Sequence, residues 1–237
     1  MSISLLYKKY VDISEKIKVH IPSVGEIMDD EDNYYKLLLL LTATPFEMMV
    51  QLDDMGIDFT SLNEYQLFCL LFPAIQNSDT HLVFGNLDLS NFKYVTGKDS
   101  DEILLFDEAQ DIVIDKTVHR KIGRVLQEIN FIEKKNKKPG NEEAKRYLLE
   151  KARKKQQRLS SKPQKSQLED LIVAMVNTKE YHYDFETTRN LSIYQFNASV
   201  RQIIKKVNFD NTMIGCYSGT VNMKDINPDQ LNWLNNK

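Results

Sequence analysis

The sequence contains few of the residues that define several classes of protein. Among 237 residues there are 2 cysteines, 8 glycines and 6 prolines. Cys69 lies in an apolar run and Cys216 lies between Gly215 and Tyr217, so they form neither a disulfide framework nor a metal-ligand spacing, and reduced thiols are expected. The low glycine and proline contents exclude collagen-like and low-complexity chains. With 42% hydrophobic residues, the chain can bury one large core or two small ones.

Long apolar runs are missing as well. The leucine run at residues 37–41 ends at Thr42 and is far below the ~20 residues that a bilayer span needs. At the N-terminus the charged residues follow the apolar ones, which is the reverse of a secretory signal. The sequence therefore predicts an intracellular protein without a membrane span.

The charged residues are unevenly distributed. Residues 1–133 hold 11 Lys/Arg and 23 Asp/Glu, residues 134–165 hold 13 and 3, and residues 166–237 hold 7 and 8, although the whole chain has a net charge of only −3. Such an excess of one sign indicates either a solvated helix or a contact surface for an anionic partner. The basic segment at 134–165 is therefore the first candidate for function.

Hydrophobic periodicity in the first third of the chain predicts a strand and then three helices. Ile17, Val19 and Ile21 alternate with polar residues as in a half-buried strand. Residues 33–43 follow an acidic stretch and predict a buried helix.

Two capping-box patterns predict the next two helices. Residues 44–47 predict a helix over 45–55, and residues 61–64 predict a helix that ends at Pro73.

The middle of the chain changes to the period of strands. Four short apolar segments predict a small antiparallel meander, at 81–84, 92–95, 103–106 and 111–114. Residues 115–133 return to helical spacing, and Pro139-Gly140 marks a lobe boundary.

The last 100 or so residues are predicted to be helical. Asn141 caps a basic helix that runs to about residue 159, Ser166 and Ser192 each begin a further helix, and residues 227–233 form a terminal turn. The predicted fold class is α+β and predominantly helical. It comprises a mixed lobe at 1–133, a basic helical connector at 134–165 and a helical C-terminal lobe at 166–237.

One string resembles a catalytic motif. Residues 103–112 read as an apolar strand followed by the Asp-Glu-Ala-Gln box that holds magnesium and water in helicase-type ATPases. That chemistry needs an upstream phosphate-binding loop, but Gly97-Lys98 is followed by Asp99 and lies too close to the box for an intervening helix. We therefore expect 107–110 to be an exposed hairpin turn. An enzyme remains an alternative only if Asp107 and Glu108 converge with other carboxylates in a cleft.

The remaining candidates for chemistry are weak. The acidic groups at 29–32 and 53–58 lack the spacing of a calcium loop, and the four histidines have no metal or nucleophile pattern. We therefore predict no catalytic residue, no metal site and no cofactor.

Two groups of residues are predicted to bind a protein partner. Clustered methionines can line an adaptable groove, and the basic helix offers charge. The residues are Met48, Met49, Met55, Lys151, Arg153, Lys154, Lys155 and Arg158. For the basic segment, three interpretations remain open: binding to an acidic protein surface, neutralisation by the acidic N-terminal lobe, and binding to nucleic acid. Tyr147 is the only aromatic residue within 134–165, so a base-stacking surface is not indicated.

Five stretches resemble proteins encoded in the tail-morphogenesis regions of phages and prophages of Gram-positive bacteria. They are residues 18–27, Tyr34-Tyr35, 41–46, 49–58, and a C-terminal stretch from 192–197 to Asn232-Trp233. The resemblance implies a non-enzymatic tail assembly chaperone or accessory tail protein in the bacterial host cytoplasm, with association to the virion as a variant. The implied partners are the tape-measure or tail-tube protein or another acidic protein surface, without a membrane, and the chain itself can form oligomers. The alternatives are a nucleic-acid-binding protein that uses 134–165 and a phage inhibitor of a host defence protein.

Overall fold

A computed structural model describes residues 4–97, 102–134, 137–161, 166–228 and 232–234. The helices are α1 (Val24–Asp29), α2 (Glu31–Thr42), α3 (Met49–Asp54), α4 (Glu64–Gln76), α5 (His81–Phe84), α6 (Lys116–Asn130), α7 (Glu142–Ser160), α8 (Gln167–Val176), α9 (Phe185–Arg189) and α10 (Ile193–Tyr217), with a 3-10 turn at Met223–Asp225. The strands are β1 (Tyr10–Asp12), β2 (Lys18–His20), β3 (Lys93–Thr96), β4 (Ile103–Asp107) and β5 (Ile112–Ile114). The predicted α+β, predominantly helical class is confirmed.

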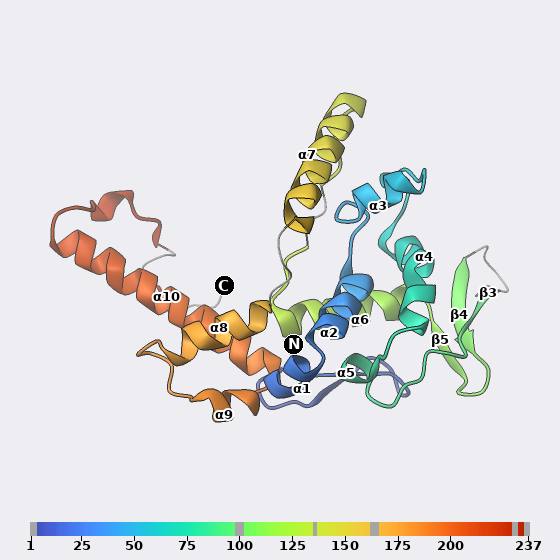
Figure 1. Cartoon of the computed structure of the whole chain (residues 1–237), viewed down its shortest axis with the longest axis horizontal. Coiled ribbons are helices and arrows are strands. Elements are labelled where there is room, and N and C mark those ends of the chain that lie inside the picture. Colours follow the sequence, from blue (N-terminus) through green and yellow to red (C-terminus); the bar gives the residue numbers. More distant parts are fainter. Residues whose placement is uncertain (1–3, 98–101, 135–136, 162–165, 229–231, 235–237) are drawn as a thin grey trace.

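Helices α2 and α6 lie at the centre of the molecule, and α7 and α10 extend from it in different directions (Figure 1). β1 and β2 form one antiparallel pair, and β3, β4 and β5 form an antiparallel sheet in that order at the opposite end from the tip of α10. β2 lies where the Ile17–Val19–Ile21 alternation predicts it, with Val19 opposite Val11 of β1.

Helix α2 carries the centre of the core. Its leucine run places Leu37, Leu38 and Leu41 on buried positions together with Tyr34, and the helix packs against α1, α4, α5 and α6. The Tyr34 hydroxyl donates a hydrogen bond to the side-chain oxygen of Asn130 at the end of α6, at 3.0 Å. Because a buried hydroxyl without a partner is costly, this bond lets a tyrosine occupy a core position.

The beginning of the chain is joined to its C-terminal part at Ser23 and Ser192, which form an isolated antiparallel bridge. The N–H of Val24 donates to the carbonyl of Leu191 and the N–H of Ile193 donates to the carbonyl of Pro22, both at 2.8 Å. Ser23 and Ser192 are also the N-caps of α1 and α10, and each has a complete capping box. Two helix beginnings therefore satisfy some of each other's unpaired N–H groups.

One apolar cluster spans the two predicted lobes. It contains residues of α2 and α4 together with Leu168 and Ile172 of α8 and with Ile193, Phe196 and Val200 of α10. A second, smaller cluster forms around Met49 and Leu52 of α3 and includes half-buried side chains of α7. The division of the chain at 133/134 and 165/166 stays a prediction about organisation, since the larger core crosses it.

The predicted end of the third helix is wrong. α4 begins after Asn63, which forms a capping box with Gln66 in place of the predicted Ser61 pair, and the helix continues through Pro73 to Gln76. Proline cannot donate to the carbonyl four residues earlier, which is that of Cys69. The Tyr94 hydroxyl of β3 donates to this carbonyl at 2.8 Å, so a distant side chain replaces the missing bond.

The strand predicted at 81–84 is also wrong, because these residues form the single helical turn α5. Leu82, Val83 and Phe84 are all buried, whereas a half-buried strand would alternate. Gly85, with φ of +60°, ends the turn. The other three strands of the meander are confirmed as β3, β4 and β5.

Several helix boundaries differ by a few residues from those predicted. The side chains of Thr44 and Glu47 make the predicted capping bonds, but they close a turn, and α3 begins only at Met49. α7 and α10 begin at the predicted caps. Ser166 caps α8 by accepting the N–H of Glu169. The terminal turn predicted at 227–233 falls partly outside the described residues.

Removing the Tyr94 hydroxyl is expected to destabilise the protein. In Tyr94→Phe the Cys69 carbonyl loses its donor, which should lower the free energy of unfolding by about 1 kcal/mol in chemical denaturation. Tyr147→Phe is the matched control, because that hydroxyl is on an exposed ring with no hydrogen bond to the described residues. Equal stability of the two variants would contradict the assigned role of Tyr94.

Candidate functional site

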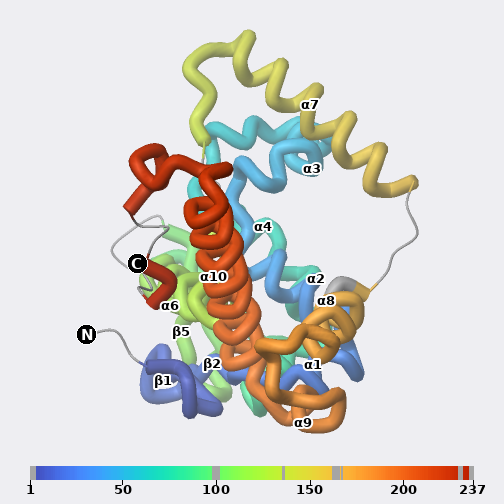
Figure 2. Tube along the Cα trace, turned by 90° about the vertical axis from the view of Figure 1, so that its left-hand side faces the viewer, coloured from blue at the N-terminus to red at the C-terminus, as the bar shows by residue number. Residues whose placement is uncertain are grey.

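The basic segment forms the long helix α7, which lies beside α3 above the centre of the molecule (Figure 2). Asn141 begins it by accepting the N–H of Ala144 at 2.8 Å, and Glu142 and Glu143 occupy its first turn. Acidic residues at this end and basic residues later complement the helix dipole. The local sequence is thus sufficient to place the helix.

The inner face of α7 is apolar and half buried. Leu148, Leu149 and Ala152 pack against the smaller apolar cluster, which includes Met49 and Leu52 of α3. Their spacing of three to four residues puts them on one side of the helix. This packing fixes which side of α7 faces solvent.

Two cations of α7 pair with acidic residues of the N-terminal part. One guanidinium nitrogen of Arg153 lies 2.6 Å from a carboxylate oxygen of Asp53 and 2.6 Å from one of Asp54. Lys145 lies 2.7 Å from Asp58. The hydrogen bonds from Lys145 and Thr60 lower the pKa of Asp58 to about 2. These contacts agree with the self-neutralisation interpretation for part of the basic segment.

The outer face of α7 carries four further cations. Lys151, Lys154, Lys155 and Arg158 are exposed, and Tyr147 beside them is 63% exposed. Their spacing of three, four and seven residues places them along one exposed side of the helix, next to the packed face. Lys154 pairs with Glu150 one turn earlier, whereas Lys151, Lys155 and Arg158 form no ion pair with the described residues. We call these four cations the outer basic face.

The structure does not bring the predicted partner residues onto one surface. Arg153 faces α3, unlike the four residues of the outer basic face. Met49 is buried in the smaller cluster and Met48 is half buried against it, while Met55 is 57% exposed. A methionine-lined groove would need all three side chains to be accessible. Their role in partner binding stays a prediction, and the burial of Met49 favours a packing role for it.

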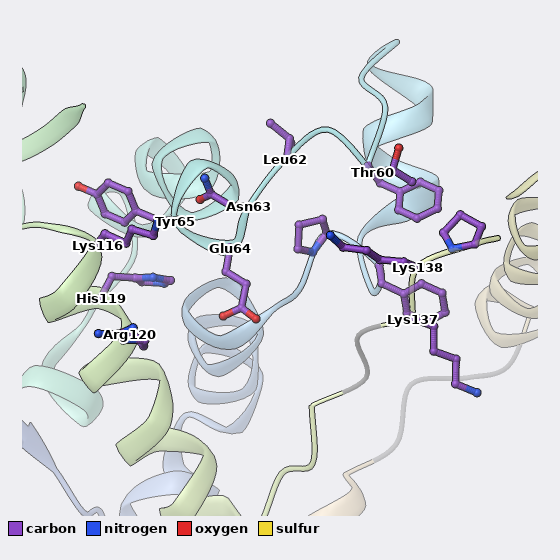
Figure 3. A pocket seen from close by; sticks show the side chains of 14 residues that line it. Thr60, Leu62, Asn63, Glu64, Tyr65, Lys116, His119, Arg120, Lys137 and Lys138 are labelled. Atoms are coloured by element: carbon purple, nitrogen blue, oxygen red, sulfur yellow. The ribbon is translucent and has the colours of Figure 1, made fainter. Parts of the chain in front are cut away.

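A separate pocket of about 320 Å³ lies between α6, the start of α4 and the segment that leads into α7 (Figure 3). Its lining comprises Pro45, Phe46, Phe59, Thr60, Leu62, Asn63, Glu64, Tyr65, Lys116, His119, Arg120, Lys137, Lys138 and Pro139. Figure 3 shows Lys116, His119 and Arg120 on one side, Lys137 and Lys138 on the other, and Glu64 between them. The pocket therefore combines apolar walls with several cations.

His119 is a buried, strongly perturbed group in this pocket. It is 6% exposed and stacks on Phe68 with 4.3 Å between the ring centroids. Burial lowers its pKa to about 4, although a hydrogen bond with the carbonyl of Leu41 favours the charged form. The imidazole is thus neutral near pH 7 and supplies a donor to one of the last carbonyls of α2.

The string at 107–110 forms a turn and not a metal-binding site. The carboxylate of Asp107 accepts the N–H of Ala109 at 2.9 Å and that of Gln110 at 3.2 Å, so it closes the β4–β5 hairpin. The predicted hairpin is confirmed, but Asp107 is buried, whereas an exposed turn was expected. The reason is that one carboxylate oxygen accepts the two backbone N–H groups and the other accepts the side-chain N–H of Gln110. Within this turn only Glu108 and Ala109 are fully exposed.

The residues that could bind a metal ion are scattered in the described part of the chain. Among those residues no group of three His, Cys, Asp or Glu side chains is close enough to hold a metal ion. Cys69 and Cys216 are free thiols. Nor does a helix of the described ranges have the length and apolarity needed to cross a bilayer.

The fold and these surfaces define a helical α+β protein with charged and apolar contact surfaces. A model of the family described as YomV second domain matches residues 155–237, about a third of the chain, from within α7 to the C-terminus. The family is YomV-like, of the Bacillus prophage SPbeta type, which is consistent with the phage origin that the sequence resemblance implies. A search of the curated proteins and a search of the solved structures gave no match.

The pocket was not predicted from the sequence. Its walls come from four stretches between residues 45 and 139, and each stretch contributes only two to six residues. The one available signal was the density of lysine at 134–138, which was interpreted as part of a helix.

Loss of Arg153 is expected to loosen α7 more than loss of its neighbour. In Arg153→Gln the two ion pairs to α3 disappear, so amide hydrogen exchange in α7 should become severalfold faster by mass spectrometry. Lys154→Gln is the matched control, because Lys154 pairs only within the helix. If both variants exchange alike, the contact between α7 and α3 does not depend on Arg153.

Mild acid is expected to destabilise the protein through His119. Because burial lowers the pKa of His119 below that of the unfolded chain, its stabilising effect is complete above about pH 6.5 and is lost as the pH falls towards about 4. Between pH 7 and pH 5 the free energy of unfolding should fall by about 2 kcal/mol in chemical denaturation. His119→Leu should lack this decrease, whereas the exposed control His182→Asn should retain it. A decrease that persists in His119→Leu would assign the acid sensitivity to other groups.

Proposed function

We propose that this chain is a non-enzymatic phage morphogenesis protein, a tail assembly chaperone or accessory tail protein, that binds an acidic surface of another tail protein. The tape-measure and tail-tube proteins are the candidate partners, and the binding takes place in the host cytoplasm. The observation that carries the proposal is the outer basic face of α7, where Lys151, Lys154, Lys155 and Arg158 are exposed on a helix that is held in place by an adjacent packed face.

The packed inner face makes the outer one suitable for binding. Leu148 and Leu149 anchor α7 to the smaller apolar cluster, and Arg153 pairs with Asp53 and Asp54. A helix that is already ordered loses less conformational entropy when a partner binds. Exposed cations raise the association rate with an acidic surface and make the binding sensitive to salt.

The second half of α10 offers an apolar surface to a partner. Residues from 201 to 217 contain no buried side chain, and Ile204, Ile214 and Tyr217 are among the exposed apolar residues. A protein that shelters a helical client needs exposed apolar helix faces of this kind. The α10 surface supports the assembly role, because it gives the chain an apolar contact area separate from its charges.

Two other functions remain as alternatives. A nucleic-acid-binding protein would use the same outer basic face, where Tyr147 is the one aromatic side chain within α7 available for stacking. Its affinity would fall steeply with salt. An inhibitor of a host defence protein would bind one host target stoichiometrically.

Charge reversal on α7 tests the proposal. The tagged chain is co-expressed with each neighbouring tail protein, and the tag is used to recover complexes. The fourfold variant Lys151→Glu, Lys154→Glu, Lys155→Glu and Arg158→Glu should retain less than about a tenth of the partner, because several like-charge contacts replace attractive ones.

The control variant carries the same change of net charge elsewhere. Lys8→Glu, Lys93→Glu, Lys121→Glu and Arg124→Glu alter exposed cations that form no side-chain ion pair with the described residues. This variant should retain the partner, and circular dichroism should show equal helix content in both variants. Failure of the unaltered chain to retain any tail protein would refute the assembly role. Capture of DNA in place of a tail protein, lost between low and moderate salt, would favour the nucleic-acid alternative.

A further inference from the structure

We propose that the pocket between α6 and the segment at residues 137–139 binds a small organic anion with an aromatic body, such as an aromatic carboxylate. This site lies apart from the outer basic face of α7 and from the α10 surface, and it does not depend on the proposed assembly role. Its chemistry follows from apolar walls, unpaired cations at the rim and the absence of a free acid among the lining residues.

The walls of the pocket suit a flat apolar ring. Phe46 and Phe59 meet edge to face with 6.4 Å between their centroids, and Pro45 and Leu62 complete this side. Phe59 is buried in the smaller core cluster, so the wall is fixed before a ligand arrives. A volume of about 320 Å³ is at the lower end of the range of small-molecule sites, which favours a ligand with one or two rings.

The rim of the pocket carries uncompensated positive charge. Lys116 and Arg120 approach from α6, and Lys137 and Lys138 approach from the opposite side (Figure 3). All four side chains are exposed, and none forms an ion pair or hydrogen bond with the described residues. Flexible cationic side chains at the entrance of an apolar pocket can contact the anionic group of a ligand while the ring of the ligand is buried in the pocket.

Three polar side chains inside the pocket are already engaged by other groups, so the rim cations are the groups available to bind an anion. Glu64, the one acid among the lining residues, lies 2.5 Å from Lys134, so its charge is already neutralised. The Tyr65 hydroxyl donates to the carbonyl of Ile114 at 2.8 Å, so Tyr65 offers the pocket its ring and not a donor. The side-chain oxygen of Asn63 is engaged as the cap of α4. The interior therefore selects for an apolar body, and the rim selects for negative charge.

The test compares two ligands that differ mainly in charge. The isotope-labelled full chain is titrated with 2-naphthoate and, separately, with its uncharged counterpart 2-naphthamide, and two-dimensional NMR follows the shifts of the amide signals. Signals of residues 59–65 and 116–120 should move, and naphthoate should bind at least about fivefold more tightly than the amide, because its carboxylate meets several partly exposed cations.

Variants of the rim separate this site from any other apolar surface. The triple variant Arg120→Gln, Lys137→Gln and Lys138→Gln, in which Lys116 is the one rim cation left, should bring the affinity for naphthoate close to that for the amide and leave the affinity for the amide unchanged. The matched control Lys151→Gln, Lys155→Gln and Arg158→Gln changes cations of α7 outside the pocket and should leave both affinities unchanged. Equal binding of the two ligands by the unaltered chain, shifts confined to other residues, or no binding would each overturn the proposal.

Discussion

The burial of α2 on several sides is the constraint on which the rest of the structure depends. Leu37 and Leu41 have almost no exposure, and α1, α4, α5 and α6 all pack against this helix. α6 comes close enough that a side chain at Gly123 would meet the carbonyl of Leu41 at 3.5 Å. The same carbonyl accepts a hydrogen bond from His119. The position of α2 thus fixes α6, and α6 in turn provides one wall of the pocket and packs against α10.

The charge of the basic segment is divided among three environments. Arg153 and Lys145 face acidic residues near α3, and Lys134 faces Glu64. The outer basic face of α7 is exposed to solvent, and Lys137 and Lys138 line the pocket. A single value of net charge for residues 134–165 hides this division. Only some of these cations are left without an ion pair to the described residues.

Local signals in the sequence predicted much of the fold, because capping is a matter of neighbouring residues. Asn141 and Ser192 begin α7 and α10 as their side chains indicate. The end of α4 was mispredicted because the donor that compensates Pro73 is Tyr94, which is 21 residues away in the sequence and belongs to a strand.

The candidate site was harder to predict than the fold. Arg153 and Lys154 are adjacent and chemically alike, yet one faces α3 and the other faces solvent. Which of them turns inward depends on how α7 is rotated against α3, and the apolar positions Leu148 and Leu149 indicate that rotation only once the smaller cluster is known. Apart from the lysines at 134–138, the pocket has no local signal in the sequence, since its walls meet only after four separate stretches have folded.

The bridge between Ser23 and Ser192 limits how the C-terminal region could be exchanged between proteins. The region that matches the YomV second domain contains α8 and α10, but Phe196 and Leu168 are buried in a core shared with residues of α1 and α2. The first N–H of α10 is satisfied by a carbonyl near the start of the chain. If this region were transferred alone to another protein, its apolar core residues would be exposed to solvent. The first N–H of α10 would also lack its hydrogen-bond acceptor. Transfer of this region to another protein therefore requires a recipient that supplies an equivalent surface.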